Sequence, residues 1–307
     1  MISKETFPAP LRSTLAATDL TNDSLPALEA AHVVTPEESG SIHVIHCLRR
    51  LLQKVEGHAV QLESDSGNTT DRPTKELEHQ VEHHIRRVLP SERSVKLHLW
   101  KGTPHRAITR VAEEADVDLI VLGKHQPRYA LDGLMGTTAD RVLRTTSQPC
   151  LVLNRTMPKR PRRIVVPSDL SPHSDRALAL TAAWAQEWNA VSGGDTSRRV
   201  MIELVNISAY ASPSYRVVDP TVGLRRRIDA VETITNGTVP IRPRIQSAPL
   251  APDGIRRIAE ESDIDMIVMG THGHGFVMRS LIGSVATEIV RSVRLPIVVV
   301  PPPKRKA

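Results

Sequence analysis

The strongest constraint on the fold is that the chain repeats itself. The segment Leu15–Ser24 (LAATDLTNDS) matches Val165–Ser174 (VVPSDLSPHS), and Asp116–Gly123 (DVDLIVLG) matches Asp263–Gly270 (DIDMIVMG). Two more pairs of blocks match in the same order: Gly136-Thr137 with Gly283-Ser284, and Gln148–Leu153 with Leu295–Val300. The offset in residue number is nearly constant across the four pairs, so we interpret the chain as a duplicated domain.

The length agrees with two domains. A chain of 307 residues holds two domains of about 150 residues each. Between the halves, Asn154–Arg163 (NRTMPKRPRR) is rich in proline and basic residues, which is typical of a surface linker. We therefore expect one domain over residues 10–155 and a second over residues 160–302.

Each half contains short apolar runs separated by segments with helical patterns. The clearest runs are Leu15–Ala17, Ile42–Leu48, Val95–Leu99 and Cys150–Leu153 in the first half, and Ile164–Val166, Val200–Ile207, Ile241–Gln246 and Ile297–Val300 in the second, with a fourth run inside each Asp-to-Gly block. This alternation is typical of βαβ units. We expect each half to be an α/β domain with a five-stranded parallel sheet and helices on both faces. Ligands of such sheets bind at the carboxyl ends of the strands, here after the first, second and fourth.

A glycine-containing loop follows the fourth run of the second half. It extends from Gly270 to Ser284, where a helical pattern begins. The free N–H groups and the dipole at a helix amino end attract an anion, and glycines let the backbone approach it closely. Without further information, the glycines are equally compatible with simple turns, and Ser284 with a helix cap.

The spacing Gly270-x2-Gly273-x9-Gly283-Ser284 resembles the ATP-binding motif of the universal stress protein family. Pro167-Ser168-Asp169 at the end of the first strand, and the runs MIVMGTHG and PIVVVP, are similar to that family as well. The resemblance extends over essentially both halves. It implies two tandem Rossmann-like domains of the adenine nucleotide alpha hydrolase type.

The resemblance also implies a binding site in the second half. Asp169 would lie near adenine and ribose, the backbone around Ile207 would meet the adenine, and the glycine loop would surround ribose and phosphates. The nucleotide would be ATP, with ADP or AMP as alternatives and Mg²⁺ as a companion ion. The candidate residues are Pro167, Ser168, Asp169, Ile207, Met269, Gly270, His272, Gly273, Arg279, Gly283, Ser284 and Val285. A turn and helix start at Asp169, with Ser171 as cap, needs no ligand and is the alternative for that residue.

The first half departs from the pattern. Gln126 and Pro127 stand where the middle glycine is expected, and proline removes a backbone donor. We therefore expect a weak, altered or empty site there, with four less favourable candidates: Asp19, Gly123, Gly136 and Thr137. The resemblance implies that the first half pairs with the second through the last strands, forming an intramolecular pseudo-dimer; a homodimer is a further option.

The composition limits which partners, which cellular compartment and which kinds of site are expected for this chain. The net charge of +6 suits an anionic partner, while an aromatic content of 3% leaves few surfaces on which nucleic acid bases could stack. Two cysteines, no apolar leader and no long apolar run indicate a cytoplasmic protein without a membrane span. The histidines at 79, 83 and 84, and His43 with His46 and Cys47, do not form a convincing metal pattern, so no metal site is expected.

The sequence favours an ATP-binding stress-response sensor or regulator rather than an enzyme, acting on an unidentified protein partner. Two alternatives remain open. One is a nucleotide-independent interaction module of the same fold. The other is a slow ATPase, in which His272 would assist hydrolysis.

Overall fold

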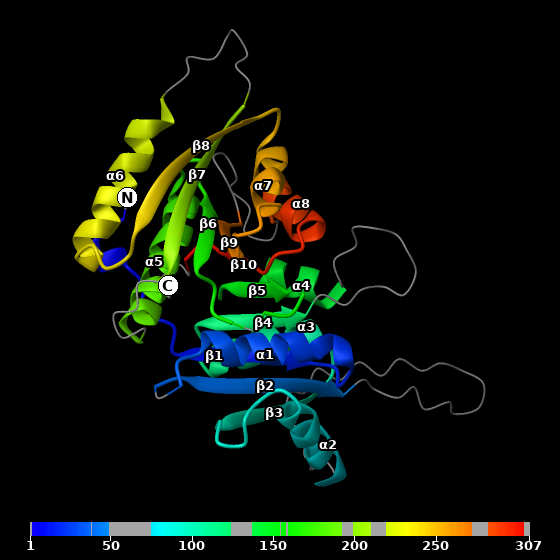
Figure 1. Cartoon of the computed structure of the whole chain (residues 1–307). Helices are drawn as coiled ribbons and strands as arrows, with labels where there is room; N and C mark the ends of the chain where they lie inside the picture. Colours follow the sequence, from blue (N-terminus) through cyan, green and yellow to red (C-terminus); the bar gives the residue numbers. More distant parts are fainter. Residues whose placement is uncertain are drawn as a thin grey trace.

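The computed structural model of the chain describes residues 2–37, 39–48, 75–123, 137–153, 155–157, 159–191, 199–209, 219–271 and 282–303. Its strands form one ten-stranded sheet in the order β3-β2-β1-β4-β5-β10-β9-β6-β7-β8 (Figure 1). Reading outward from the centre, each half presents its strands in the same order. The predicted α/β fold with two repeated halves is therefore confirmed.

The first half supplies β1 to β5. Its elements are β1 (Ser13–Thr18), α1 (Leu25–Val34), β2 (Ser41–Leu48), α2 (Lys75–Arg86), β3 (Val95–Lys101), α3 (Pro104–Glu114), β4 (Leu119–Gly123), α4 (Thr137–Thr145) and β5 (Cys150–Leu153), with short 3₁₀ turns at Lys4–Thr6 and Asn22–Ser24. All pairings within this half are parallel, as the alternation of apolar runs and helices predicts.

The second half supplies β6 to β10. Its elements are β6 (Arg163–Pro167), α5 (Pro172–Val191), β7 (Met201–Ala209), α6 (Pro220–Thr235), β8 (Ile241–Ala248), α7 (Ala251–Ala259), β9 (Met266–Gly270), α8 (Ser284–Ser292) and β10 (Ile297–Val300). These strands are also mutually parallel. The two third strands, β3 and β8, are longer than the apolar runs alone indicated, because Trp100 and Lys101 of β3 and Ser247 and Ala248 of β8 also pair with the neighbouring strand.

The halves join through their last strands. β10 pairs antiparallel with β5, with Val298 opposite Leu151. All four residues of each strand are buried, so the pairing covers two edges that would otherwise expose apolar side chains and unpaired backbone groups. This is the intramolecular pseudo-dimer expected from the sequence.

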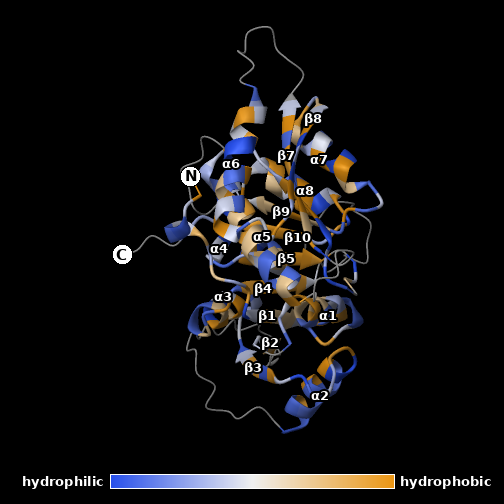
Figure 2. Ribbon diagram, turned by 60° about the vertical axis from the view of Figure 1, so that its left-hand side comes forward, coloured by the Kyte–Doolittle hydropathy of each residue, from blue (hydrophilic) through white to orange (hydrophobic). Residues whose placement is uncertain are grey.

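The helices form a layer on each face of the sheet. Helices α1, α2, α5 and α6 pack on one face, and α3, α4, α7 and α8 pack on the other. Each of the two hydrophobic cores contains residues from both halves, so the sheet is packed as one unit. Figure 2 shows hydrophobic residues along the central strands and hydrophilic residues on the outer surface of helices such as α2. Among the described residues, no helix is both long and apolar enough to cross a bilayer.

The segment between the halves is less exposed than a surface linker. Met157 is only 5% exposed and belongs to the core beneath α1 and α5. The Arg160 guanidinium donates from Nε to the Val33 carbonyl at the end of α1, at 3.2 Å. The proline and basic content predicted a connection between the halves, but an isolated methionine among polar residues gave no sign that it would be buried.

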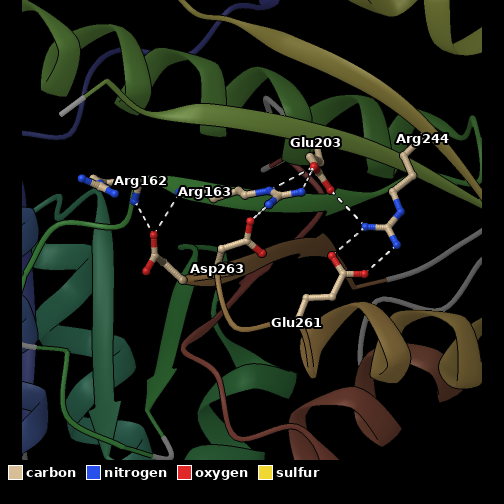
Figure 3. Close-up of polar contacts among 7 residues, drawn as sticks. Arg162, Arg163, Glu203, Arg244, Glu261 and Asp263 are labelled. Atoms are coloured by element: carbon tan, nitrogen blue, oxygen red, sulfur yellow. Dashed lines mark hydrogen bonds and ion pairs between the residues drawn. The ribbon is translucent and has the colours of Figure 1, made fainter. Parts of the chain in front are cut away.

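The halves differ at the amino end of their second and third strands. In the second half, buried Glu203 of β7 pairs with Arg163 of β6 and with Arg244 of β8 (Figure 3). In the first half, the register places His43 and His98 at the corresponding positions. Their rings are stacked, with Nδ1 of His43 2.9 Å from Nε2 of His98. An ion-pair network on one side is thus replaced by a histidine pair on the other.

We expect the histidine pair to make the stability of the protein sensitive to acid. Burial, then the neighbouring His98 and Lys96, lowers the pKa of His43 to about 4, from 6.5 in the unfolded chain. The unfolded state therefore binds the extra proton between these values, so the stabilisation is complete above about pH 6.5 and is lost as the pH falls toward 4. We expect about 3 kcal/mol of unfolding free energy to disappear over this range, as measured by urea denaturation. In a His43→Gln variant the pH dependence should be flatter; an unchanged slope would contradict this assignment.

Candidate functional site

The turn after β6 carries the first predicted site residues. The buried Ser168 amide donates to the Val205 carbonyl at 2.7 Å, which holds the turn against β7. The Ser168 hydroxyl accepts from the Leu170 amide at 3.2 Å and lies 3.1 Å from the Ser174 hydroxyl at the start of α5. Pro167 ends β6 and is half-buried. The chain therefore leaves the sheet in a defined direction.

Asp169 lies in this turn with an exposed side chain. Its Oδ1 accepts from the Ser171 amide at 3.1 Å, and Leu170 between them has a φ of 64°. Ser171 caps α5 as expected, since its hydroxyl accepts from the Ser174 amide at 3.3 Å. The capped helix start thus coexists with a carboxylate at the carboxyl edge of the sheet, so the two readings of this segment do not exclude each other.

Gly270 ends β9 directly beside this turn. A Cβ at Gly270 would lie 3.0 Å from the backbone carbon and oxygen of His173 in α5, closer than ordinary contact. Met269, its neighbour, is buried in the core. Glycine at position 270 therefore allows this close approach of β9 and the start of α5, and a side chain there would require one of them to shift by a few tenths of an ångström.

The amino end of α8 is tied to the same strand end. Gly283, the residue before the helix, donates its N–H to the Thr271 carbonyl at 2.7 Å. Thr271 in turn donates to the Val300 carbonyl at 3.0 Å. Ser284 is exposed as the first residue of α8, and Val285 follows. The first-turn amides of α8 have no partners within the helix, so they and the helix dipole favour an anion beside Gly270.

The end of β7 forms the third side of this region. Asn206 donates from its side-chain amide to the Ser168 carbonyl at 2.8 Å. Ile207, the next residue, is half-buried and packs against Gly254 of α7. Because β6 lies between β7 and β9 in the sheet, these three strand ends surround the point where the strand order reverses.

The structure therefore brings together most of the predicted residues that it describes. His272, Gly273, Arg279 and, in the first half, Gly136 lie outside the described residues, as does the side chain of Thr137. Sequence reasoning missed Asn206, His173 and Thr271, which support the site through their side chains or backbone. Asn206 had a signal, since it is a polar residue near the end of an otherwise apolar run.

The first half repeats the frame of the site. Thr18 lies 2.8 Å from Ser24 through their hydroxyls, as Ser168 lies near Ser174. Nδ1 of His46 is 3.0 Å from the Thr18 carbonyl, the counterpart of the Asn206 contact. A Cβ at Gly123 would lie 3.0 Å from the Asp23 carbonyl oxygen. The same backbone arrangement is thus built twice.

The two aspartate turns nevertheless differ in the hydrogen bond that one hydroxyl group makes. Asp19 accepts at Oδ1 from both the amide of Thr21, at 3.0 Å, and its hydroxyl, at 2.7 Å. In the second half the corresponding hydroxyl, that of Ser171, is directed to the helix cap instead. The Thr21 hydroxyl therefore holds the carboxylate of the first half, whereas the Ser171 hydroxyl holds the start of a helix.

A metal site at either edge would require His, Cys, Asp or Glu side chains grouped as ligands. Among the side chains that the structure describes, no three His, Cys, Asp or Glu residues are grouped closely enough to hold an ion. Cys47 and Cys150 are both free, and burial raises the pKa of the Cys47 thiol to about 12, so it is protonated at neutral pH.

Comparison with known proteins agrees with this architecture. The model of the universal stress protein family matches residues 11–154 and 204–301. The chain belongs to the universal stress protein family. In the solved universal stress protein from Archaeoglobus fulgidus, 94% of this chain aligns with 98% of that chain at a TM-score of 0.64 and 20% identity, which shows a common fold over both halves.

Curated relatives carry the same family name. The chain is 27% identical over 105 residues to a universal stress protein of Methanocaldococcus jannaschii, covering 34% of this chain and 65% of the relative. It is 24% identical over 195 residues to one of Synechocystis, covering 60% of this chain and 58% of the relative. The chain thus spans less than two thirds of the length of these two relatives.

Proposed function

We propose that the second half of this universal stress protein binds ATP at the carboxyl ends of β6, β7 and β9, and that the protein acts as a nucleotide-dependent sensor or regulator rather than as an enzyme. The observation that supports this most is the hydrogen bond from the Gly283 amide to the Thr271 carbonyl, at 2.7 Å. It fixes the amino end of α8 beside Gly270 and the Asp169 turn.

The residues present fit a nucleotide. The first-turn amides of α8 and the exposed Ser284 hydroxyl would receive phosphate oxygens, with Val285 contributing its amide. The exposed Asp169 carboxylate would accept from ribose hydroxyls. The backbone around Ile207 would meet the adenine. His272, Gly273 and Arg279 complete the proposal from sequence, and Mg²⁺ would neutralise part of the phosphate charge.

A regulatory role agrees with how the site is constructed. Its donors come from backbone and from a helix end, groups that bind charge without transferring protons. The first half would serve as scaffold, pairing through β5 and β10 and binding nucleotide weakly or not at all.

Matched aspartate variants test the proposal. In Asp169→Asn, the remaining amide oxygen can still accept from the Ser171 N–H, so the turn is retained while the charge is removed. We expect the Kd for ATP to rise by roughly tenfold or more, because a hydrogen bond to a charged group contributes about 1.5–3 kcal/mol. Equilibrium dialysis with labelled ATP measures it.

The corresponding change in the first half, Asp19→Asn, is the control. It removes the same charge from the same turn and should leave the affinity of the second half within about twofold of wild type. Equal losses in the two variants would show that both halves bind. An absence of saturable ATP binding to the wild type would defeat the proposal.

A further inference from the structure

Leu170 adopts a conformation that its neighbours must maintain. Its φ of 64° lies in the left-handed region, which costs a residue with a Cβ about 1–2 kcal/mol. It stands directly after Asp169, so the direction of that carboxylate depends on this conformation. Helix α6 meets Leu170 from outside the sheet: a Cβ at Gly223 would lie 2.7 Å from the Leu170 Cδ1 atom, so the leucine packs directly against the helix backbone.

Arg227 of α6 joins three parts of the second half. Its Nη2 donates to the Leu170 carbonyl at 2.5 Å, and its Nε donates to Asp175 Oδ1 in the first turn of α5. Its Nη1 donates to the Gly223 carbonyl at 3.1 Å. The Asp175 side chain is 8% exposed and that of Arg227 is 20% exposed, so this ion pair is largely shielded from water. We call these contacts of Arg227 with Leu170 and Asp175 the Arg227 bridge.

The first half has the same turn without this bridge. Leu20 has the same φ of 64°. Leu25 follows Ser24, however, where Asp175 follows Ser174, so the carboxylate that would receive an arginine is absent from the sequence at that position. Instead, Nε2 of His84 from α2 lies 3.3 Å from the Ser24 hydroxyl. The bridge is thus a feature of the half whose glycine motif is intact.

We propose that Arg227 is a positioning residue for the nucleotide site: by holding the Leu170 carbonyl and Asp175 together, it fixes the turn so that Asp169 faces the ligand before the ligand arrives. This inference rests on the proposed ATP site. A preorganised turn loses less conformational freedom on binding, so the bridge raises affinity without touching the nucleotide.

Two readouts test this role in the intact chain. The first is hydrogen exchange of the Leu170 and Ser171 amides without nucleotide, since both amides donate within the turn. In Arg227→Met we expect their exchange to become roughly tenfold faster, as for loss of one charge-assisted hydrogen bond. The Leu20 and Thr21 amides of the first half should keep their rates and serve as an internal reference.

The second readout is the affinity for ATP. Arg227→Met should raise the Kd roughly tenfold, and Arg227→Lys should recover part of the loss, because an ammonium reaches Leu170 or Asp175 but lacks the planar fork. Arg225→Met is the matched control, since Arg225 is exposed on the same helix, and it should leave both readouts unchanged.

A double-mutant cycle separates positioning from general damage. If Arg227 acts through Asp169, Arg227→Met should have little further effect on the Kd of an Asp169→Asn protein. Two results would overturn the inference about Arg227 while leaving the proposed ATP site intact. One is that Arg227→Met raises the Kd of the Asp169→Asn protein as much as it raises that of the wild type. The other is that Arg227→Met leaves the hydrogen exchange of the Leu170 and Ser171 amides unchanged in a protein that binds ATP. Wild-type protein that binds no ATP would instead overturn the proposed function, and with it the role of Arg227 toward a nucleotide.

Discussion

Replacing Gly270 by valine is expected to lower the affinity for ATP by at least about 100-fold. The new Cβ would lie 3.0 Å from the backbone carbon and oxygen of His173, so α5 and β9 must separate. The γ methyl groups of valine enlarge that movement, which would displace the Asp169 turn from the amino end of α8 so that the ribose and phosphate contacts are not made together. Loss of two charge-assisted hydrogen bonds corresponds to about 100-fold or more in affinity. Equilibrium dialysis gives the affinity, and urea denaturation should show a loss of about 1–3 kcal/mol from overpacking.

Gly123→Val separates the loss of binding from the loss of stability. Its Cβ would lie 3.0 Å from the Asp23 carbonyl oxygen, so the steric conflict is similar but lies in the first half. We expect a comparable decrease in the free energy of unfolding with an ATP affinity close to that of the wild type. If both glycine variants lose affinity equally, the site does not belong to the second half alone.

A large effect on stability is also expected at Glu203. Its side chain is 7% exposed and lies between Arg163 and Arg244 (Figure 3). Glu203→Gln keeps the shape but leaves two guanidinium groups without their shared carboxylate. Breaking a buried ion pair from one side costs about 3–5 kcal/mol, and here each arginine retains a second acid, Asp263 or Glu261. We therefore expect a loss of about 2–3 kcal/mol in urea denaturation.

Glu261→Gln is the control for this network. Glu261 pairs with Arg244 as well, and that hydrogen bond lowers the pKa of its carboxyl, but its side chain is 34% exposed. Ion pairs open to water contribute about 1 kcal/mol or less, so this variant should be affected much less than Glu203→Gln. Equal losses would mean that burial does not set the strength of the network.

Much of the fold could be predicted because the same sequence blocks occur in both halves of the chain. The matched Asp-to-Gly blocks and the short apolar runs between helical segments indicate parallel strands, and the family resemblance implied that the two last strands pair. The backbone arrangement of the candidate site could be predicted only where it depends on glycines and on the turn at Asp169. The family resemblance supplied the roles, and those roles remain proposals.

The remainder depended on contacts between distant residues. Arg227 and Asp175 are ordinary charged residues in helical segments, and only packing of α5 against α6 brings them to Leu170. Likewise, the exchange of Glu203 and Arg244 for His43 and His98 becomes visible only once the strand register is known. The pattern of apolar residues in one sequence shows the periodicity along a single helix or strand. The interactions described here depend on how different helices and strands are placed relative to one another.

The central claim is tested most directly by a crystal structure of the protein grown with millimolar Mg²⁺ and ATP. We predict one nucleotide per chain, with its phosphates at the amino end of α8, its ribose at Asp169 and its adenine beside Ile207. A second half in which protein side chains fill this space, or a nucleotide bound only at the first half, would contradict the account.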